Sequence, residues 1–263
     1  MLIFLKLFAL TSTVFFIILF GWDNLYNSTC YILILPFVVL LLISHSFIEL
    51  KMRERICFKN CYFKENSIFA KILSSRIFVT IFYIFVSVLM SITVLFGIIF
   101  YPLELWFYLI FHVGLVIFFY RYFHYLFRDT VREDYLPIFA REWAINISSL
   151  FLIAVFLYLT LYSYEPKYLQ QTLSQTIINA SNSVASSCEI TNYIIKLKIE
   201  LDSIFWWIVS NSTDALDNKL TKLAIWVIFL IINTLAILGI NRLIAQIAYL
   251  IDTKFNRELD GNI

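Results

Sequence analysis

The sequence predicts an all-α, polytopic membrane protein with six transmembrane helices and an extracytoplasmic helical loop between the fifth and the sixth. Three observations indicate this fold class. First, 61% of the 263 residues are apolar and 14% are charged, whereas a soluble domain has roughly 45–50% and 25%. Second, six apolar stretches are long enough to cross the hydrocarbon core, which takes about 20 helical residues. Third, short connections rich in Lys and Arg alternate along the chain with short connections that have neither. The long loop 163–222 has five lysines, but long loops cross the membrane largely regardless of charge.

Each of the six stretches is expected to be a helix, because irregular backbone facing lipid would leave polar groups unsatisfied. The first stretch could instead be a signal peptide. Its apolar run is longer than such a segment usually has, and no A-x-A-like cleavage site follows it, so we expect a retained anchor. The six expected spans are Leu2–Phe20, Tyr31–Leu50, Ile77–Phe100, Leu103–Tyr120, Trp143–Tyr162 and Leu223–Ile240.

The placement of Lys and Arg predicts which side each connection faces. The connections GWDNLYNSTC and YPLE have neither residue. By contrast, the loop 51–76 has seven, the connection between the fourth and fifth spans has four, and the C-terminal tail has three. The positive-inside rule then puts both termini in the cytoplasm. The Phe-, Ile-, Tyr- and Asn-rich, Gly-poor composition resembles an AT-rich coding source, either bacterial or organellar. We expect the bacterial inner membrane; in an organelle, the termini would face the matrix.

These assignments divide the chain into three parts: 1–162 with five spans and the basic loops, 163–222 as the outer loop, and 223–263 with the sixth span and a cytoplasmic extension. The outer loop contains IIKLKIELDSIFWWIVS, Ile194 to Ser210, which alternates like a strand but also repeats apolar residues at helical spacing. A seventh span is excluded, because it would put four charged residues near mid-bilayer, at roughly 2.5–3.5 kcal/mol for each Lys or Asp.

We expect two helices in this loop, near 168–188 and 190–209. An isolated strand needs a partner, and no other part of the loop alternates convincingly. Opposite charges at i,i+4 also favour a helix. The helices either pair or the second lies along the membrane, with Trp at the interface. Whether the loop only caps the spans or binds a ligand stays open. The expected outer interface consists of Leu197, Leu201, Trp206 and Trp207.

Four cysteines fall on two sides of the expected membrane. Cys30 and Cys188 are both expected outside, where oxidation is permitted, and they are a candidate disulfide that depends on their Cα separation. Cys57 and Cys61 share a cytoplasmic helix face without further ligands for zinc. We interpret these two as inert thiols, and we expect no metal site.

His112 lies near the middle of the fourth span. An ionisable side chain inside a membrane is a functional hypothesis by default. A neutral histidine bonded to a Ser or Tyr of a neighbouring helix would also explain it. A haem shared with His45 is disfavoured, because the two histidines differ in depth by about 7 Å at 1.5 Å per residue.

Polar residues mark one face of three spans: Ser87 and Ser91 on the third, Asn146 on the fifth and Asn233 on the sixth. Such groups usually hydrogen-bond across helix interfaces, which makes them packing seams. The functional alternative is a polar permeation path. The sequence allows both interpretations.

The sixth span continues into an amphipathic stretch. Together they would form a helix of about 36 residues, roughly 54 Å long. Half of it is expected to project into the cytoplasm with an apolar face that a partner subunit or the other cytoplasmic loops must cover. The loop 51–76 interleaves basic and apolar residues and is expected to lie on the inner leaflet. The apolar stripe of the extension is Leu243, Ile244, Ile247, Ile251 and Phe255.

No catalytic motif is found: the sequence has no P-loop, G-x-S-x-G, H-E-x-x-H or dinucleotide-binding turn. It also has no basic run suited to nucleic acid. We expect a non-enzymatic subunit or assembly scaffold of a larger membrane complex, without a cofactor. Its expected partners are the lipid bilayer and other membrane subunits, or further copies of itself. The alternative is a channel or transporter that uses the polar faces of the third, fifth and sixth spans, although such sites usually interrupt helices with Gly or Pro.

Overall fold

The computed structural model describes residues 2–62, 76–162, 166–215 and 219–260, and the regular elements in these ranges are helices. The side chains of residues 55–62 and 219–232 and the loop 63–75 lie outside the description, and with them Cys57, Cys61 and most of the expected surface helix. The elements are α1 (Leu2–Leu25), the 3₁₀ turn η1 (Cys30–Leu33), α2 (Ile34–Tyr62), α4 (Arg76–Ile98), α5 (Leu103–Leu126), α6 (Leu136–Tyr162), α7 (Leu173–Asn182), α8 (Glu189–Ala215) and α9 (Lys219–Asp260).

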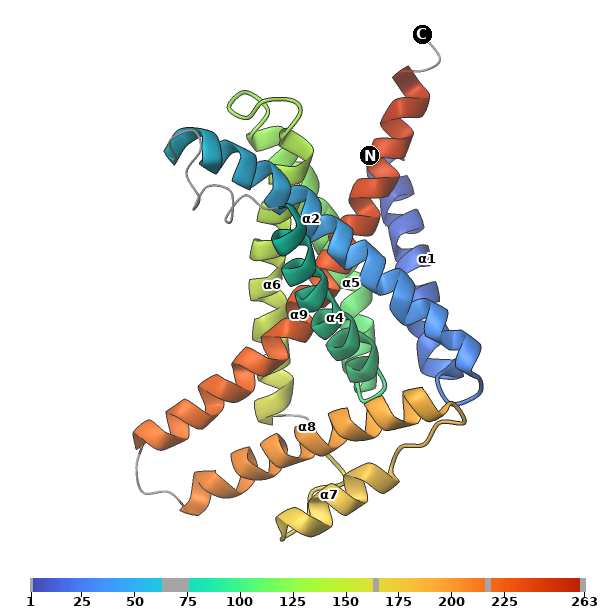
Figure 1. Cartoon of the computed structure of the whole chain (residues 1–263), viewed down its shortest axis with the longest axis vertical. Helices are drawn as coiled ribbons and strands as arrows, with labels where there is room; N and C mark the ends of the chain where they lie inside the picture. The colour runs from blue at the N-terminus through green and yellow to red at the C-terminus, as the bar shows by residue number, and fades with distance from the viewer. Residues whose placement is uncertain (1, 63–75, 163–165, 216–218, 261–263) are drawn as a thin grey trace.

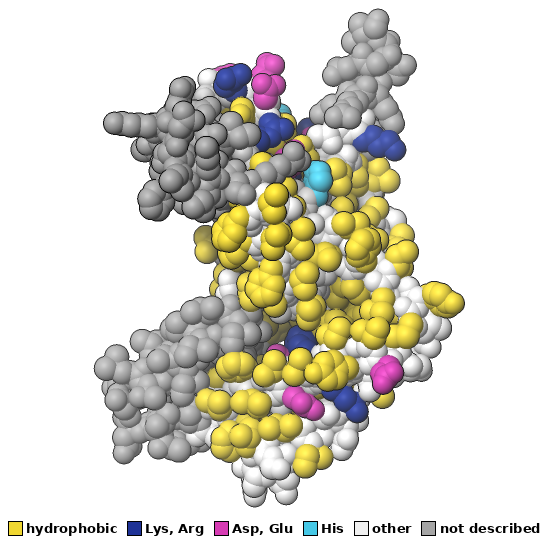
Figure 2. Space-filling model, viewed as in Figure 1, with side chains coloured by type: hydrophobic (Ala, Val, Ile, Leu, Met, Phe, Trp, Pro, Cys, Tyr) yellow, Lys and Arg dark blue, Asp and Glu magenta, His cyan; other side chains and the backbone are white. Residues whose placement is uncertain are grey.

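Within the described residues, six helices are long and apolar enough to cross a membrane: α1, α2, α4, α5, α6 and α9. This confirms the prediction of an all-helical, multi-pass membrane protein. In α9 the qualifying window is Asn233–Lys254. The side chains of residues 219–232 lie outside the description, so the start of the expected sixth span, Leu223–Ile240, stays a prediction. Figure 2 shows apolar side chains covering the middle of the visible face, with charged side chains gathered toward its two ends.

Helix α9 is the central helix of the bundle. It runs diagonally through the molecule and contacts α1, α2, α4, α5 and α6 (Figure 1). It lies close against α4 at Gly239, where an added Cβ would be 2.6 Å from Val94 Cγ2 and 3.3 Å from the backbone oxygen of Met90. Only a residue without a side chain lets the two helices pack this closely.

Most of the apolar stripe of α9 is covered by helices of the chain itself. Leu243, Ile244 and Ile247 are buried and Ile251 is half-buried, whereas the side chain of Phe255 lies outside the description. The polar pair Asn241–Arg242, where the expected span ended, is also buried and finds partners inside the bundle. The C-terminal end of α9 extends beyond the other helices (Figure 1).

Helices α7 and α8 lie across one end of the bundle, and both chain termini lie at the other end (Figure 1). The segment that fitted both a strand and a helix is part of α8, and Lys198 pairs with Asp202 one turn further along it. Buried residues at intervals of four mark the inner face of α8: Thr191, Ile195, Ile199 and Ser203.

The start of α8 is anchored to the connection between α1 and α2. Cys30 and Cys188, which the sequence singled out as a candidate pair, form a disulfide with their Cα atoms 4.9 Å apart. Beside it, Ser186 Oγ donates to the backbone oxygen of Tyr26 at 2.7 Å. The backbone N–H of Ser187 donates to the backbone oxygen of Asn27 at 3.0 Å. Three contacts therefore hold α8 across the ends of the spans.

Candidate functional site

A cluster of charged side chains is buried where α2, α6 and α9 meet. We call it the polar network. It consists of Ser46 and Glu49 on α2, Arg141 and Glu142 on α6, and Arg242, Gln246 and Tyr249 on α9. All of these residues lie in helical segments that qualify as membrane spans. Because α2 runs toward the end of the bundle that holds the termini and Glu49 lies late in α2, the network is nearer to that end.

Arg141 has no exposed side-chain surface. Its Nη1 donates to Gln246 Oε1 at 2.7 Å and to Glu49 Oε2 at 3.2 Å. Its Nη2 donates to the backbone oxygen of Ser46 at 3.0 Å, and its guanidinium lies 4.9 Å from the centre of the Tyr249 ring. Arginine has five N–H donors in a fixed plane, so these partners on two helices hold it in one orientation.

Arg242 forms a two-point ion pair with Glu142. Nη1 donates to Oε1 at 3.0 Å and Nη2 to Oε2 at 2.7 Å. Nη1 also donates to Ser46 Oγ at 3.0 Å, and the guanidinium lies 3.7 Å above the Phe47 ring. Two parallel charge-assisted hydrogen bonds fix both distance and rotation, so this pair sets the position of α9 against α6.

The charges of the network balance. Two guanidinium groups face the carboxylates of Glu49 and Glu142, and Glu49 also accepts from the Tyr249 hydroxyl at 3.1 Å. Moving one unpaired charge out of water costs several kcal/mol even after relaxation, whereas a paired and hydrogen-bonded charge is tolerated. Each member of the network is therefore needed to keep the others compatible with burial.

Two further polar contacts flank the network along α9. Toward α9's C-terminus, Asp252 accepts from Arg121 Nη2 at 2.7 Å and from the Tyr120 hydroxyl at 3.2 Å. Toward its N-terminus, Asn241 Oδ1 lies 2.8 Å from His112 Nε2 and accepts from Ser148 Oγ at 2.8 Å. Polar side chains of α9 thus bind α5 and α6 above and below the network.

The sequence-predicted intramembrane histidine is part of this interior. His112 is fully buried, and since Asn241 presents its oxygen, the histidine carries a proton on Nε2 while Nδ1 has no partner among the described residues. Its partner is an Asn rather than the Ser or Tyr that we expected. His45 is exposed and lies 3.1 Å from Gln246 Nε2, so the two histidines contact different residues of α9.

The polar residues predicted to mark a seam or a path lie in separate places. Ser91 donates to the backbone oxygen of Pro36 on α2 at 3.1 Å, and Ser87 donates to its own helix. Asn146 is exposed. Asn233 borders a cavity near α8. The described hydrogen bond of Ser91 joins two helices, whereas that of Ser87 stays within α4.

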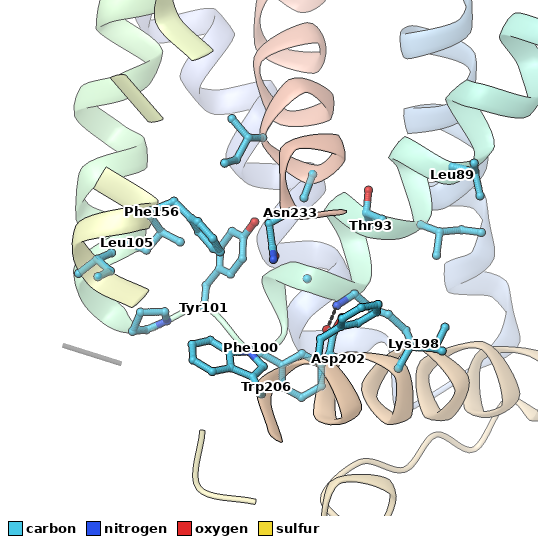
Figure 3. Close-up of a pocket in the computed structure, with 18 of the residues that line it drawn as sticks. Leu89, Thr93, Phe100, Tyr101, Leu105, Phe156, Lys198, Asp202, Trp206 and Asn233 are labelled. Carbon is cyan, nitrogen blue, oxygen red and sulfur yellow. Dashed lines mark hydrogen bonds and ion pairs between the residues drawn. The ribbon is translucent and has the colours of Figure 1, made fainter. Parts of the chain in front are cut away.

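That cavity has a volume of about 540 Å³ and lies between α8, the nearer ends of α4, α5 and α6, and residues 233–237 of α9 (Figure 3). Leu197, Leu201 and Trp206, three residues of the expected outer interface, line it. Trp207 points elsewhere, with a buried indole N–H. This side of α8 therefore forms one wall of the cavity. Among the described residues, no group of three His, Cys, Asp or Glu side chains could hold a metal ion.

Comparison of the chain with protein-family models, with characterised proteins and with solved structures finds no significant match. Function must therefore be inferred from the residues and contacts of this chain.

The polar network was missed at the level of sequence because Arg141 and Arg242 were counted among the basic residues of a loop and a tail. One signal was present. Each of them interrupts an apolar helical pattern instead of lying beyond its end, and each stands beside another polar residue, Glu142 or Asn241. Charges embedded in apolar runs are a sign of paired intramembrane groups.

We predict that Arg141→Met destabilises the folded protein by about 3 kcal/mol, because it removes the ion pair with Glu49 and leaves the buried Gln246 and the backbone oxygen of Ser46 without this donor. Unfolding in detergent micelles, followed by circular dichroism, measures this change. The matched control is Arg132→Met, whose side chain is 82% exposed, with an expected change within about 0.5 kcal/mol. Equal stability of the two variants would show that the network does not hold the bundle together.

Proposed function

We propose that this protein is a non-enzymatic subunit or assembly scaffold of a larger membrane complex. The observation that carries the proposal is the internal pairing of charges in the bundle: the buried Arg141 and Arg242 bind the half-buried Glu49 and Glu142. An ion or substrate site needs polar atoms that a solute can reach and leave. Here such an exchange would break two-point, charge-assisted contacts in a buried site, at high cost.

A rigid interior supports a scaffold role. The network joins α2, α6 and α9, while Asp252 and Asn241 bind α9 to α5 and α6. Packed interiors deform little, so such a bundle presents its outer surfaces in fixed positions to neighbouring proteins. The alternative, a channel or transporter, has less support, because the polar residues that suggested a path lie in separate places. Ser91 contacts α2, Asn146 is exposed and Asn233 borders the cavity near α8.

For the orientation, we propose that both termini are cytoplasmic and that the membrane is the bacterial inner membrane. Support comes from the arrangement of the ends. Arg53, Arg121, Arg128 and Arg132 belong to the end of the bundle with the termini, as the positive-inside rule requires of a cytoplasmic face. The disulfide lies at the opposite end, where an oxidising compartment would preserve it.

The scaffold role predicts that the protein, gently solubilised from its native membrane, is recovered with at least one other chain in a fixed ratio. Native mass spectrometry measures the ratio and identifies the chains. In the matched experiment, the purified protein alone in liposomes should conduct no ions. A monomer or homo-oligomer without other chains would contradict the proposal, as would a conductance that Asn233→Leu changes without altering the fold.

The orientation predicts the behaviour of the four cysteines. In intact spheroplasts, a membrane-impermeant maleimide should label none, because Cys30 and Cys188 are oxidised and Cys57 and Cys61 face the cytoplasm. After treatment with an impermeant phosphine reductant, two thiols should react. The Cys57→Ser/Cys61→Ser variant is the control and should give the same two. If the maleimide labelled the wild type before reduction and did not label the control variant, Cys57 and Cys61 would face outward. The proposed orientation would then be reversed.

A further inference from the structure

The cavity beside α8 lies where the spans end. Gly97, Phe100 and Pro102, from the end of α4 and the start of α5, border it, and Tyr168 borders it on the side of the outer loop. Residues 99–102 connect two candidate spans, and Leu89 lies further inside one of them, so the cavity extends from the ends of the spans toward their middle. Its volume of about 540 Å³ falls within the roughly 300–1,000 Å³ of ligand sites.

The lining of the cavity is amphipathic. Leu89, Leu105 and Phe156, from three different spans, form apolar walls, and Lys198 and Asp202 of α8 stand together at the opposite edge (Figure 3). These two side chains form an ion pair, and Lys198 Nζ lies 5.9 Å from the centre of the Phe100 ring. A ligand that matches this lining has apolar chains and a charged end.

Two uncharged polar groups lie between the apolar walls and the ion pair. Figure 3 shows Tyr101, from the connection between α4 and α5, and Asn233, from α9, reaching toward the interior. Burial raises the pKa of the Tyr101 hydroxyl, and the nearby Asp202 carboxylate raises it further. The phenol therefore keeps its proton at physiological pH and can donate a hydrogen bond to an oxygen of the ligand, such as a glycerol ester carbonyl.

The charges at the edge favour one class of occupant. Because Lys198 and Asp202 are already paired, a ligand with a single negative charge would bind Lys198 and leave Asp202 beside an anion without its partner. A headgroup with both signs avoids this cost, since its phosphate can pair with Lys198 and its ammonium with Asp202. A protein helix, about 10–12 Å in diameter with side chains, is too large for this space.

We propose that the cavity binds one zwitterionic glycerophospholipid of the phosphatidylethanolamine class. An acyl chain of the lipid would lie between α4, α5, α6 and α9, and its headgroup would lie at Lys198 and Asp202. This gives α8 a role beyond capping the spans. The disulfide and the hydrogen bonds at Ser186 and Ser187 hold the helix in place over the site. The inference does not depend on the scaffold role.

The test is native mass spectrometry of the delipidated full-length protein, titrated with phosphatidylethanolamine or with phosphatidylglycerol of the same acyl chains. We expect one bound lipid per chain and about tenfold tighter binding of phosphatidylethanolamine, the size of one charge-assisted contact. Leu201→Trp should fill the cavity and abolish this adduct. Its control is Leu150→Trp, at a 62% exposed position of α6, which should bind as the wild type does.

A second pair of variants tests the charges. Lys198→Gln should bind phosphatidylethanolamine about tenfold more weakly, whereas Lys196→Gln, on the same helix but outside the cavity lining, should not. Circular dichroism checks that each variant is folded. Equal affinity of the wild type for the two lipids would overturn the proposal, and so would an adduct that survives Leu201→Trp or a cavity occupied by a polypeptide.

Discussion

The two-point ion pair between Arg242 and Glu142 is the contact on which the arrangement of the bundle depends. Arg242 cannot lose its proton at accessible pH, so a buried Arg242 must find a carboxylate. Glu142 offers both oxygens at 2.7 and 3.0 Å. This requirement selects one rotation and one depth of α9 among the many that an apolar helix could adopt.

The other contacts of α9 follow from that position. Asn241, the preceding residue, reaches His112 and Ser148, and Gln246, one turn further on, meets Arg141. Gly239 allows close contact with α4. Apolar packing alone distinguishes poorly between registers in lipid, where the tails are as apolar as the side chains and burial provides little drive for association. We infer that the polar contacts specify the register and that close packing contributes most of the cohesion.

Several parts of the fold could be predicted because they depend on local patterns. Span length and apolar composition indicated the transmembrane helices, and opposite charges at i,i+4 favoured the helix that became α8. Cys30 and Cys188 were paired from their expected side of the membrane. The network could not be predicted in this way, because Glu49, Arg141 and Arg242 are separated by about a hundred residues from one to the next. The cavity depends on the shape of five helices, and no short motif records it.

The two ends of the molecule are held by different kinds of contact. At the end with the termini, paired charges hold α2, α6 and α9 together, and at the other end the disulfide holds α8 over an amphipathic cavity. A rigid bundle is what both proposals need: fixed surfaces for neighbouring subunits, and a preformed site for a lipid, which lowers the ordering cost of binding.

The most direct test of this account is a double-mutant cycle on Arg242 and Glu142, measured as the free energy of unfolding in detergent micelles. Arg242→Met and Glu142→Met should each destabilise the protein by about 3 kcal/mol, because each breaks the two-point pair between side chains that are 8% and 14% exposed. The double variant removes both charges and should be no less stable than the weaker single variant, with a coupling energy above about 1 kcal/mol. Additive losses would contradict the central role of this pair.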